Sequence, residues 1–426
     1  AAIDGTVLPA RTVQTTHEGR PLWVRYDLKA ISDAVDRDAL RQRPDGMWRY
    51  SELLPLEDDA DRVSLGETQT PLLQAPRLAA HLGLRNLLIK DESRLPTGSF
   101  KARGMAMAVS MAGELGLTRL AAPTAGNAGS ALAAYAARAG MEAYIFMPAD
   151  TPMVNRYEAA LFGAQAYLVD GLITDCGAIV REGVEAMGWF DMSTLKEPYR
   201  IEGKKTMGLE LADQLDWRLP DVILYPTGGG TGLIGMWKAF AELEALGCLE
   251  RPEKPRLISC QSDGCAPIAN AYAAEERFAQ PAADAHTIAS GIRVPAAVGD
   301  FMILDAVRDS GGSALTADET KLVEWMHTAN ALEGIALCPE AAACVDVLAG
   351  LVRDGDVDPD EQVVLFNTGA AQKYVDAIAT DLPTVEPPID FETLSPRWSS
   401  RSGSQKPAWT SAASGRSAGP STAIPR

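Results

Sequence analysis

Short apolar runs alternate with alanine-rich segments along most of this chain, and this alternation limits the possible folds more than any other feature. Five runs have the length and boundaries of buried strands: 86–89, 143–147, 222–225, 256–259 and 362–366. Three segments have the composition of helices: 102–115, 128–139 and 233–245. Strands that alternate with helices favour a mostly parallel sheet with right-handed crossovers. The sequence therefore predicts an α/β fold between about residues 66 and 385.

The two ends of the chain differ from this central part. Residues 1–65 are polar and mixed, which predicts an N-terminal extension that wraps on a core. Residues 386–426 are rich in serine and have little to bury, which predicts a disordered C-terminal tail. With 426 residues in all, the chain is long enough for two or three domains.

Charge and composition exclude several classes of function. The net charge of −18 repels phosphate backbones, so we expect no nucleic-acid partner. The longest apolar runs are too short to span a membrane, and the first residues lack the pattern of a signal peptide. Six scattered cysteines without a CxxC pair predict buried, reduced thiols, and four histidines without ligand spacing predict no metal site. We therefore expect a cytoplasmic protein without a metal.

Lys101 is the first candidate for catalysis. It follows Thr97-Gly98-Ser99-Phe100 and falls in the first turn of a predicted helix. The positive end of a helix disfavours a cation, so this position lowers the pKa of the amine and favours the neutral nucleophile that Schiff-base chemistry requires. An isolated lysine is more often a surface residue with its ammonium in water, and the surrounding motif reverses that preference here.

Two small-residue loops follow predicted strands. In the first, Thr124 to Gly129 surround Asn127, whose side chain can donate to an oxygen on the edge of a flat ligand; a plain helix cap is an equally good interpretation. In the second, Gly228, Gly229 and Gly230 precede Thr231 and Gly232 at the start of a helix. Uncovered backbone N–H groups at a helix N-terminus bind phosphate, and we favour this over a flexible turn.

Two further segments are more ambiguous by themselves. Thr368 closes the last predicted strand and faces the same crevice, although capping the next helix is its more usual role. The segment 199–206 concentrates three cations, among them Arg200 and Lys204, just ahead of an apparent helix. A second anion site and a solvated charged face are about equally good interpretations of it.

Together these segments resemble the tryptophan-synthase-β-like family of pyridoxal-phosphate enzymes, known as fold type II, and within it the threonine synthases. The resemblance rests on five motifs in order: GETQTPL, TGSFKARG, TAGNAG, GGGTG and NTG. The sequence departs from the family pattern after NTG, where Ala370 to Tyr374 stand in place of a glycine-rich turn.

The resemblance implies a domain layout and a set of roles. It implies a large cofactor-binding domain from residues 66–103 and 192–385, and a small α/β domain from residues 104–191. Lys101 would form the Schiff base with pyridoxal 5'-phosphate and move protons. The remaining cofactor contacts would be Asn127 to the phenolic oxygen, Gly228, Gly229, Gly230, Thr231 and Gly232 to the phosphate, and Thr368 to the ring nitrogen. Thr124, Arg200 and Lys204 would contact the substrate.

The implied reaction converts O-phospho-L-homoserine and water to L-threonine and phosphate, a carbon–oxygen lyase reaction on a phosphorylated amino acid in threonine biosynthesis. A homodimer is the family expectation. A hydroxyl at the ring nitrogen suits elimination and replacement better than transamination. Two alternatives stay open: a dehydratase or ammonia-lyase acting on serine, threonine or a related amino acid, and a pyridoxal-phosphate-binding protein without turnover.

Overall fold

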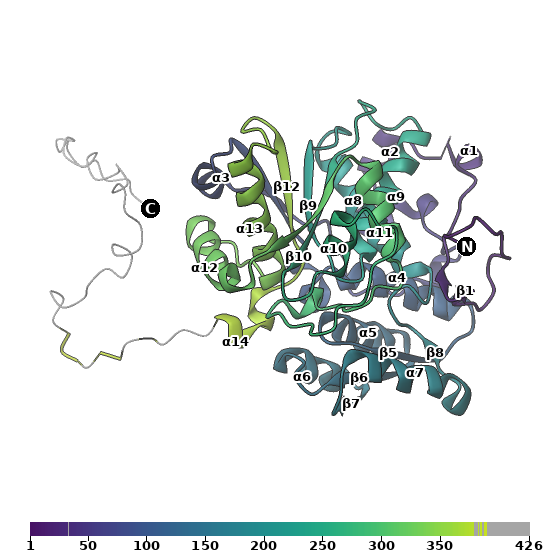
Figure 1. Cartoon of the computed structure of the whole chain (residues 1–426). Helices are drawn as coiled ribbons and strands as arrows, with labels where there is room; N and C mark the ends of the chain where they lie inside the picture. The colour runs from purple at the N-terminus through teal and green to yellow at the C-terminus, as the bar shows by residue number, and fades with distance from the viewer. Residues whose placement is uncertain (33, 379–381, 383, 386, 390–426) are drawn as a thin grey trace, which may run out of the picture. The chain divides into compact units, whose positions relative to one another are not determined.

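The structure is a computed structural model that describes residues 1–32, 34–378, 382, 384, 385 and 387–389. The chain up to residue 379 clusters as one compact unit (Figure 1). The predicted tail, residues 386–426, lies outside the described residues apart from 387–389. Among the described residues, no helix combines the length and the apolar character that crossing a bilayer requires.

The larger sheet has six strands: β3 (Leu72–Gln74), β4 (Asn86–Asp91), β9 (Val222–Pro226), β10 (Arg256–Ser262), β11 (Ser313–Ala317) and β12 (Gln362–Asn367). Their order is β11-β10-β9-β12-β4-β3, and all neighbours are parallel except β3 and β4. Strand β12, the last in sequence, therefore lies between β9 and β4. The carboxyl ends of these three strands meet at one edge of the sheet.

Helices cover both faces of this sheet (Figure 1). One face packs against α3 (Pro76–Leu82), α12 (Leu322–Glu333) and α13 (Pro339–Asp354). The other packs against α8 (Tyr199–Gln214), α9 (Thr231–Ala245), α10 (Pro267–Ala273) and α11 (Asp300–Asp309). Strands buried on both faces are apolar throughout rather than alternating, which is why β9 and β12 stand out in the sequence.

The smaller sheet has four parallel strands in the order β7-β6-β5-β8: β5 (Arg119–Pro123), β6 (Glu142–Pro148), β7 (Gln165–Val169) and β8 (Phe190–Asp191). One face packs against α4 (Lys101–Glu114), α5 (Asn127–Ala139) and α6 (Met153–Leu161). The other packs against α7 (Ile173–Met187). Most alanines of α4 and α5 are buried, and their small side chains let the two helices pack closely.

The first 65 residues form short elements that lie on the two cores. These are β1 (Thr16–His17), β2 (Arg20–Pro21), α1 (Leu28–Ile31), α2 (Arg37–Gln42) and the 3₁₀ helices η1 (Met47–Leu53) and η2 (Asp59–Asp61). Leu40 and Tyr50 join the core beside α8 and α9, while Met47 and Leu54 join the core beside α4. Residues in this part of the chain thus contribute to both cores, and its division from the following domains stays a prediction.

The remaining elements are short: η3 (Glu92–Arg94), η4 (Pro96–Gly98), η5 (Ser290–Ile292), η6 (Glu319–Lys321), η7 (Ala371–Lys373) and α14 (Val375–Ile378).

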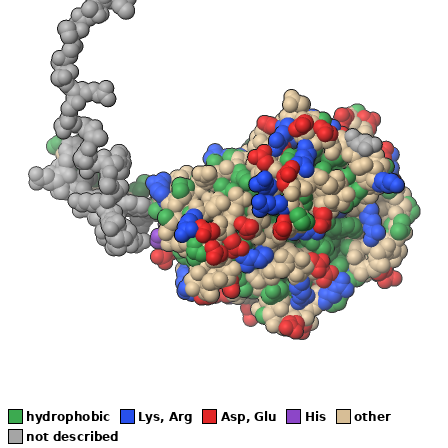
Figure 2. All heavy atoms as spheres, turned by 90° about the horizontal axis from the view of Figure 1, so that it is seen from above, with side chains coloured by type: hydrophobic (Ala, Val, Ile, Leu, Met, Phe, Trp, Pro, Cys, Tyr) green, Lys and Arg blue, Asp and Glu red, His purple; other side chains and the backbone are tan. Residues whose placement is uncertain are grey.

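The α/β fold with parallel sheets is confirmed, and every strand and helix predicted by range is present with ends shifted by three residues at most. All six cysteines are buried and free. The face of the molecule in Figure 2 carries acidic and basic side chains interspersed rather than one broad field of a single sign.

Candidate active site

The strand order brings distant parts of the sequence to one place. Lys101 follows β4, Thr368 follows β12, and the glycines 228–230 follow β9. Two backbone hydrogen bonds join the first two segments: Phe100 N donates to Thr368 O at 3.0 Å, and Ala370 N donates to Gly98 O at 2.9 Å. Asn127, which follows strand β5 of the smaller sheet, lies next to these segments: a Cβ added to Gly369 would be 3.2 Å from Asn127 Nδ2. The predicted cofactor residues therefore converge between the two sheets.

Lys101 is the first residue of α4 and is partly buried. Its Nζ lies 3.9 Å from the centroid of the Phe100 ring, and no carboxylate among the described residues forms an ion pair with it. Burial, followed by the charge of Arg200, lowers the pKa of Lys101 to about 7. Burial is thus the main cause of the lowered pKa, whereas the sequence suggested the helix end and a nearby cation; Arg200 is such a cation. A substantial fraction of this amine is neutral and nucleophilic near neutral pH.

The glycine loop 228–230 joins β9 to α9, with Thr231 and Gly232 in the first turn of the helix. Gly230 has φ +76°, and a Cβ there would lie 2.3 Å from Ile303 Cδ1, so a larger residue does not fit. Within the described part of the chain, the N–H groups of the three glycines donate to no other protein group. Free N–H groups at the positive end of a 15-residue helix form an anion site.

Asn127 is the first residue of α5 and is 6% exposed. Its Nδ2 donates to Tyr374 Oη at 3.3 Å, and its Oδ1 has no hydrogen-bond partner among the described residues. The Thr124 hydroxyl holds this loop, because it accepts from Gly126 N at 3.1 Å and from Gly129 N at 3.2 Å. The observed bonds of Thr124 are those of a helix cap, and its predicted role toward a substrate stays a prediction.

Thr368 is buried beside a thiol. Its Oγ1 lies 4.0 Å from Cys338 Sγ, and Cys338 precedes the first turn of α13. The site therefore combines a half-neutral amine, a glycine cradle with free N–H groups, an incompletely bonded amide and a hydroxyl. These groups match an aldehyde, a phosphate, a phenolic oxygen and a pyridine nitrogen, respectively. The residues present fit pyridoxal phosphate.

The cationic segment at 199–206 forms the first two turns of α8, and the cations are buried, so the interpretation as a solvated charged face is wrong. Arg200 Nη1 donates to Met192 O at 2.8 Å, while its Nε has no hydrogen-bond partner and lies 3.8 Å from Glu197 Oε1. Lys204 Nζ donates to the backbone oxygen of Phe100 at 2.7 Å, in the residue that precedes Lys101. The substrate contacts of Arg200 and Lys204 stay predictions.

The burial of this segment has a physical cause that sequence inspection misses. Lys205 and Lys238 are each paired with both Glu202 and Glu242 at 2.8–2.9 Å. Tyr26, from the N-terminal extension, covers this cluster and donates to Glu202 Oε2 at 2.7 Å. Carboxylates from two different helices, Glu202 on α8 and Glu242 on α9, and a tyrosine from the extension thus compensate the charge of Lys205, which a local pattern assigns to water.

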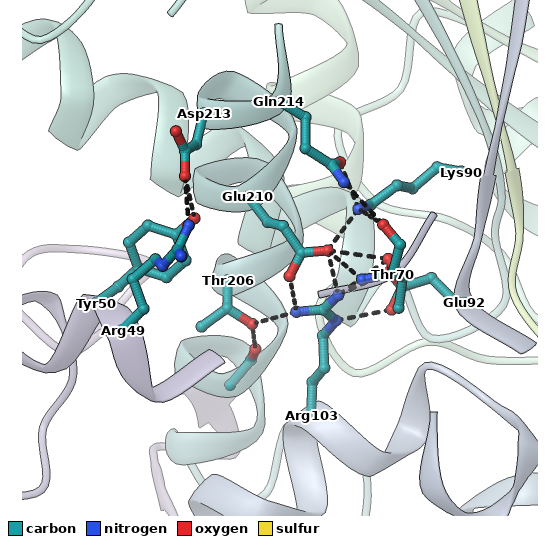
Figure 3. A network of polar contacts seen from close by, with 11 residues as sticks. Arg49, Tyr50, Thr70, Lys90, Glu92, Arg103, Thr206, Glu210, Asp213 and Gln214 are labelled. Atoms are coloured by element: carbon teal, nitrogen blue, oxygen red, sulfur yellow. Dashed lines mark hydrogen bonds and ion pairs between the residues drawn. The ribbon is translucent and has the colours of Figure 1, made fainter. Parts of the chain in front are cut away.

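A second buried network joins α4, α8 and the end of β4 (Figure 3). Arg103 pairs with Glu92 at 2.7 Å and with Glu210 at 3.0 Å, and Thr70 donates to Glu92 at 2.7 Å. Lys90 also pairs with Glu210. The helices α4 and α8 cross here so closely that a Cβ on Gly203 would lie 2.1 Å from Arg103 O. This network fixes α8 against α4 and so fixes Arg200 relative to Lys101.

Sequence inspection missed two residues that lie in the site. Glu340, in the first turn of α13, accepts from Tyr374 Oη at 2.6 Å and from Gly291 N at 2.8 Å through its Oε1. Its Oε2 has no hydrogen-bond partner among the described residues. Tyr374 follows η7, in the segment that departs from the family pattern after NTG. That departure was the one available signal for Tyr374, and the Pro339-Glu340 helix start was the one for Glu340.

Comparison with known proteins agrees with this geometry. The family model for pyridoxal-phosphate dependent enzymes matches residues 63–369. Threonine synthase of Methanocaldococcus jannaschii is 34% identical over 381 residues, covering 89% of this chain and 93% of that protein. Threonine synthase of Mycobacterium tuberculosis is 32% identical over 343 residues, covering 80% of this chain and 92% of that protein.

Solved structures of more distant proteins share the fold. Diaminopropionate ammonia lyase from Escherichia coli superposes with a TM-score of 0.64 at 19% identity, covering 76% of this chain and 93% of that one. A threonine deaminase from Solanum lycopersicum superposes with a TM-score of 0.63 at 18% identity, covering 88% and 99%. At these identities the likeness concerns the fold alone. From the family match and its threonine synthase relatives, this chain belongs to the family of pyridoxal-phosphate dependent enzymes.

Proposed function

We propose that this protein is a threonine synthase that converts O-phospho-L-homoserine and water to L-threonine and phosphate. Two threonine synthases share about a third of their residues with nearly the whole chain, which supports this reaction over others of the family. We also propose that the enzyme is a homodimer, as the family resemblance implies.

The observation that carries the proposal is a second cationic group beside Lys101, separate from the glycine loop. Arg200 is buried, presents an unbonded Nε and is close enough to lower the pKa of Lys101. The glycine loop accounts for one phosphate, that of the cofactor. A buried guanidinium with spare donors supports a second anion, such as the phosphate of a substrate.

The proposed roles follow from these positions. Pyridoxal phosphate, when bound, would supply the electron sink that acidifies the proton on the substrate's amino-bearing α carbon and then those on the β carbon. Lys101 takes the proton from the α carbon, because its pKa near 7 leaves a neutral amine at working pH. Arg200 binds the phosphate and holds it as it leaves the γ carbon. Lys204 donates to the Phe100 carbonyl and so fixes the peptide group that joins Phe100 to Lys101. A proton also leaves the β carbon as the phosphate departs, and a proton is delivered to the γ carbon. Water then adds its hydroxyl at the β carbon and gives its proton to the released phosphate, and Lys101 returns a proton to the α carbon.

The test is turnover of O-phospho-L-homoserine by the holoenzyme. We expect threonine and phosphate in equal amounts, no turnover by Lys101→Ala, and a kcat/KM reduced about a hundredfold in Arg200→Met, from the loss of charge-assisted bonds to the phosphate. Arg256→Met is the matched control, because Arg256 pairs with Glu361 at the amino end of β10, away from the site.

Formation of a 2-oxo acid from threonine or serine, with no product from the phosphorylated substrate, would overturn the proposal in favour of a dehydratase or ammonia-lyase. Absence of turnover on all three substrates by protein that retains its cofactor would favour a protein that binds the cofactor without catalysis.

A further inference from the structure

Tyr374 lies at a junction of three parts of the site. Its ring is 4% exposed, and its hydroxyl contacts Glu340 from α13 and Asn127 from α5. It belongs to the segment after Thr368 that departs from the family pattern, and the proposed mechanism gives it no role. Its hydroxyl therefore connects the Glu340 carboxylate to the Asn127 amide.

The donors and acceptors in this chain of hydrogen bonds have a fixed order. The Glu340 carboxylate accepts only, and its Oε1 already receives Gly291 N–H at 2.8 Å, so the proton between Glu340 and Tyr374 comes from the tyrosine hydroxyl. With its proton committed, the Tyr374 oxygen can only accept. The group of Asn127 that faces it at 3.3 Å is therefore the NH₂, not the carbonyl oxygen.

This order has a consequence for Asn127. One N–H of its amide is held by Tyr374, so the amide cannot rotate to exchange its nitrogen and oxygen without losing that bond. The second N–H and Oδ1 remain, and Oδ1 has no partner among the described residues. An amide whose NH₂ is fixed in place loses less conformational freedom when it donates to a ligand than a freely rotating one does.

We propose that Tyr374, oriented by Glu340, is a positioning residue that locks the Asn127 amide with an N–H toward the phenolic oxygen of the cofactor. The proposal rests on the cofactor contact proposed for Asn127. A donor at that oxygen favours its ionised form and tightens cofactor binding. The carboxylate of Glu340 thus acts on the cofactor through two other side chains, without touching it.

The test uses cofactor binding alone, so a failure of the threonine synthase reaction leaves it intact. In Tyr374→Phe, which keeps the ring, we expect the dissociation constant of pyridoxal phosphate from the reconstituted apoprotein to rise about fivefold to tenfold, the loss of one hydrogen bond. We also expect the pH midpoint of the visible absorbance of the bound cofactor to rise, by up to about one pH unit, because the ionised phenolic oxygen loses a donor.

A double-mutant cycle separates this role from a structural one. If Tyr374 acts through Asn127, Tyr374→Phe changes neither quantity further in an Asn127→Ala background. Tyr135→Phe is the matched control, since Tyr135 is also a buried tyrosine that donates to a glutamate, Glu67, outside the site. It should lower stability and leave the midpoint unchanged. An unshifted midpoint in Tyr374→Phe, or an equal shift in the Asn127→Ala background, would overturn the proposal.

Discussion

Lys101 and Arg103 are two residues apart on α4, and their surroundings differ in kind. Arg103 is 0% exposed and its guanidinium meets two carboxylates and two hydroxyls (Figure 3), so its pKa is raised despite burial. Lys101 faces the opposite side of the helix, meets an aromatic ring and no paired carboxylate, and its pKa is lowered to about 7. One cation is compensated and the other is not.

The same contrast distinguishes the two regions of the molecule. In the network of Arg103, the oxygens of Glu92, Glu210 and Thr70 all have partners. In the region around Lys101, the buried atoms without partners include Asn127 Oδ1, Glu340 Oε2 and Arg200 Nε. Since unpaired buried polar atoms cost free energy, their collection around one lysine marks the place where a ligand completes the bonding.

The largest expected effect is on catalysis. Lys101→Met should reduce turnover by at least about 10⁴-fold, because the amine that captures the cofactor and moves the proton is gone. The apoprotein should still fold, since no ion pair is lost. Turnover assays together with urea unfolding of the same preparation check both statements. A Lys101→Met protein that loses several kcal/mol of stability would show that the lysine is structural, like Arg103.

The second effect is on stability. Glu210→Gln should lower the free energy of unfolding by about 3–5 kcal/mol, because it leaves Arg103 and Lys90 buried with too little negative charge. Asp305→Asn, which breaks the exposed pair with Arg277, should cost below about 1 kcal/mol. Chemical denaturation of both variants measures the difference. Equal effects would mean that the buried network does not hold α8 to α4.

The third effect is a pH dependence of the apoprotein. Lys101 ionises near pH 7 when folded and near its ordinary pKa of 10.5 when unfolded, so between these values the unfolded chain binds more protons. The contribution of Lys101 therefore makes stability rise with pH from about 7 to about 10.5, and below pH 7 its destabilising effect is complete. The stability of wild type relative to Lys101→Met, measured by denaturation across this range, should rise with pH. A difference independent of pH would contradict the low pKa.

Much of the fold and part of the site can be predicted from sequence because the causes are local. Strands buried on both faces must be apolar along their length, so β9 and β12 are visible as runs. The glycines 228–230 are recognisable because three successive residues without a side chain stand between a strand and a helix, where a Cβ would clash with neighbouring protein atoms. Lys101 and Asn127 are recognisable because each starts a helix that follows a strand and a loop of small and polar residues.

The pairing of charges is not predictable from sequence in the same way. The cations at 199–206 are compatible with a solvated face until the fold brings Tyr26 from the N-terminal extension and Glu242 from α9 to this segment. Nothing local in the sequence marks Glu340 and Tyr374 as partners, because the fold alone brings Tyr374 into contact with both Asn127 and Glu340.

By itself the sequence determined the α/β architecture, the amine and the glycine cradle, because backbone geometry and apolar periodicity act over neighbouring residues. Only the tertiary structure decided which buried charges are compensated and which remain free. That outcome depends on groups more than a hundred residues apart, such as Arg103 and Glu210, whose interaction exists only after the sheets and helices have packed.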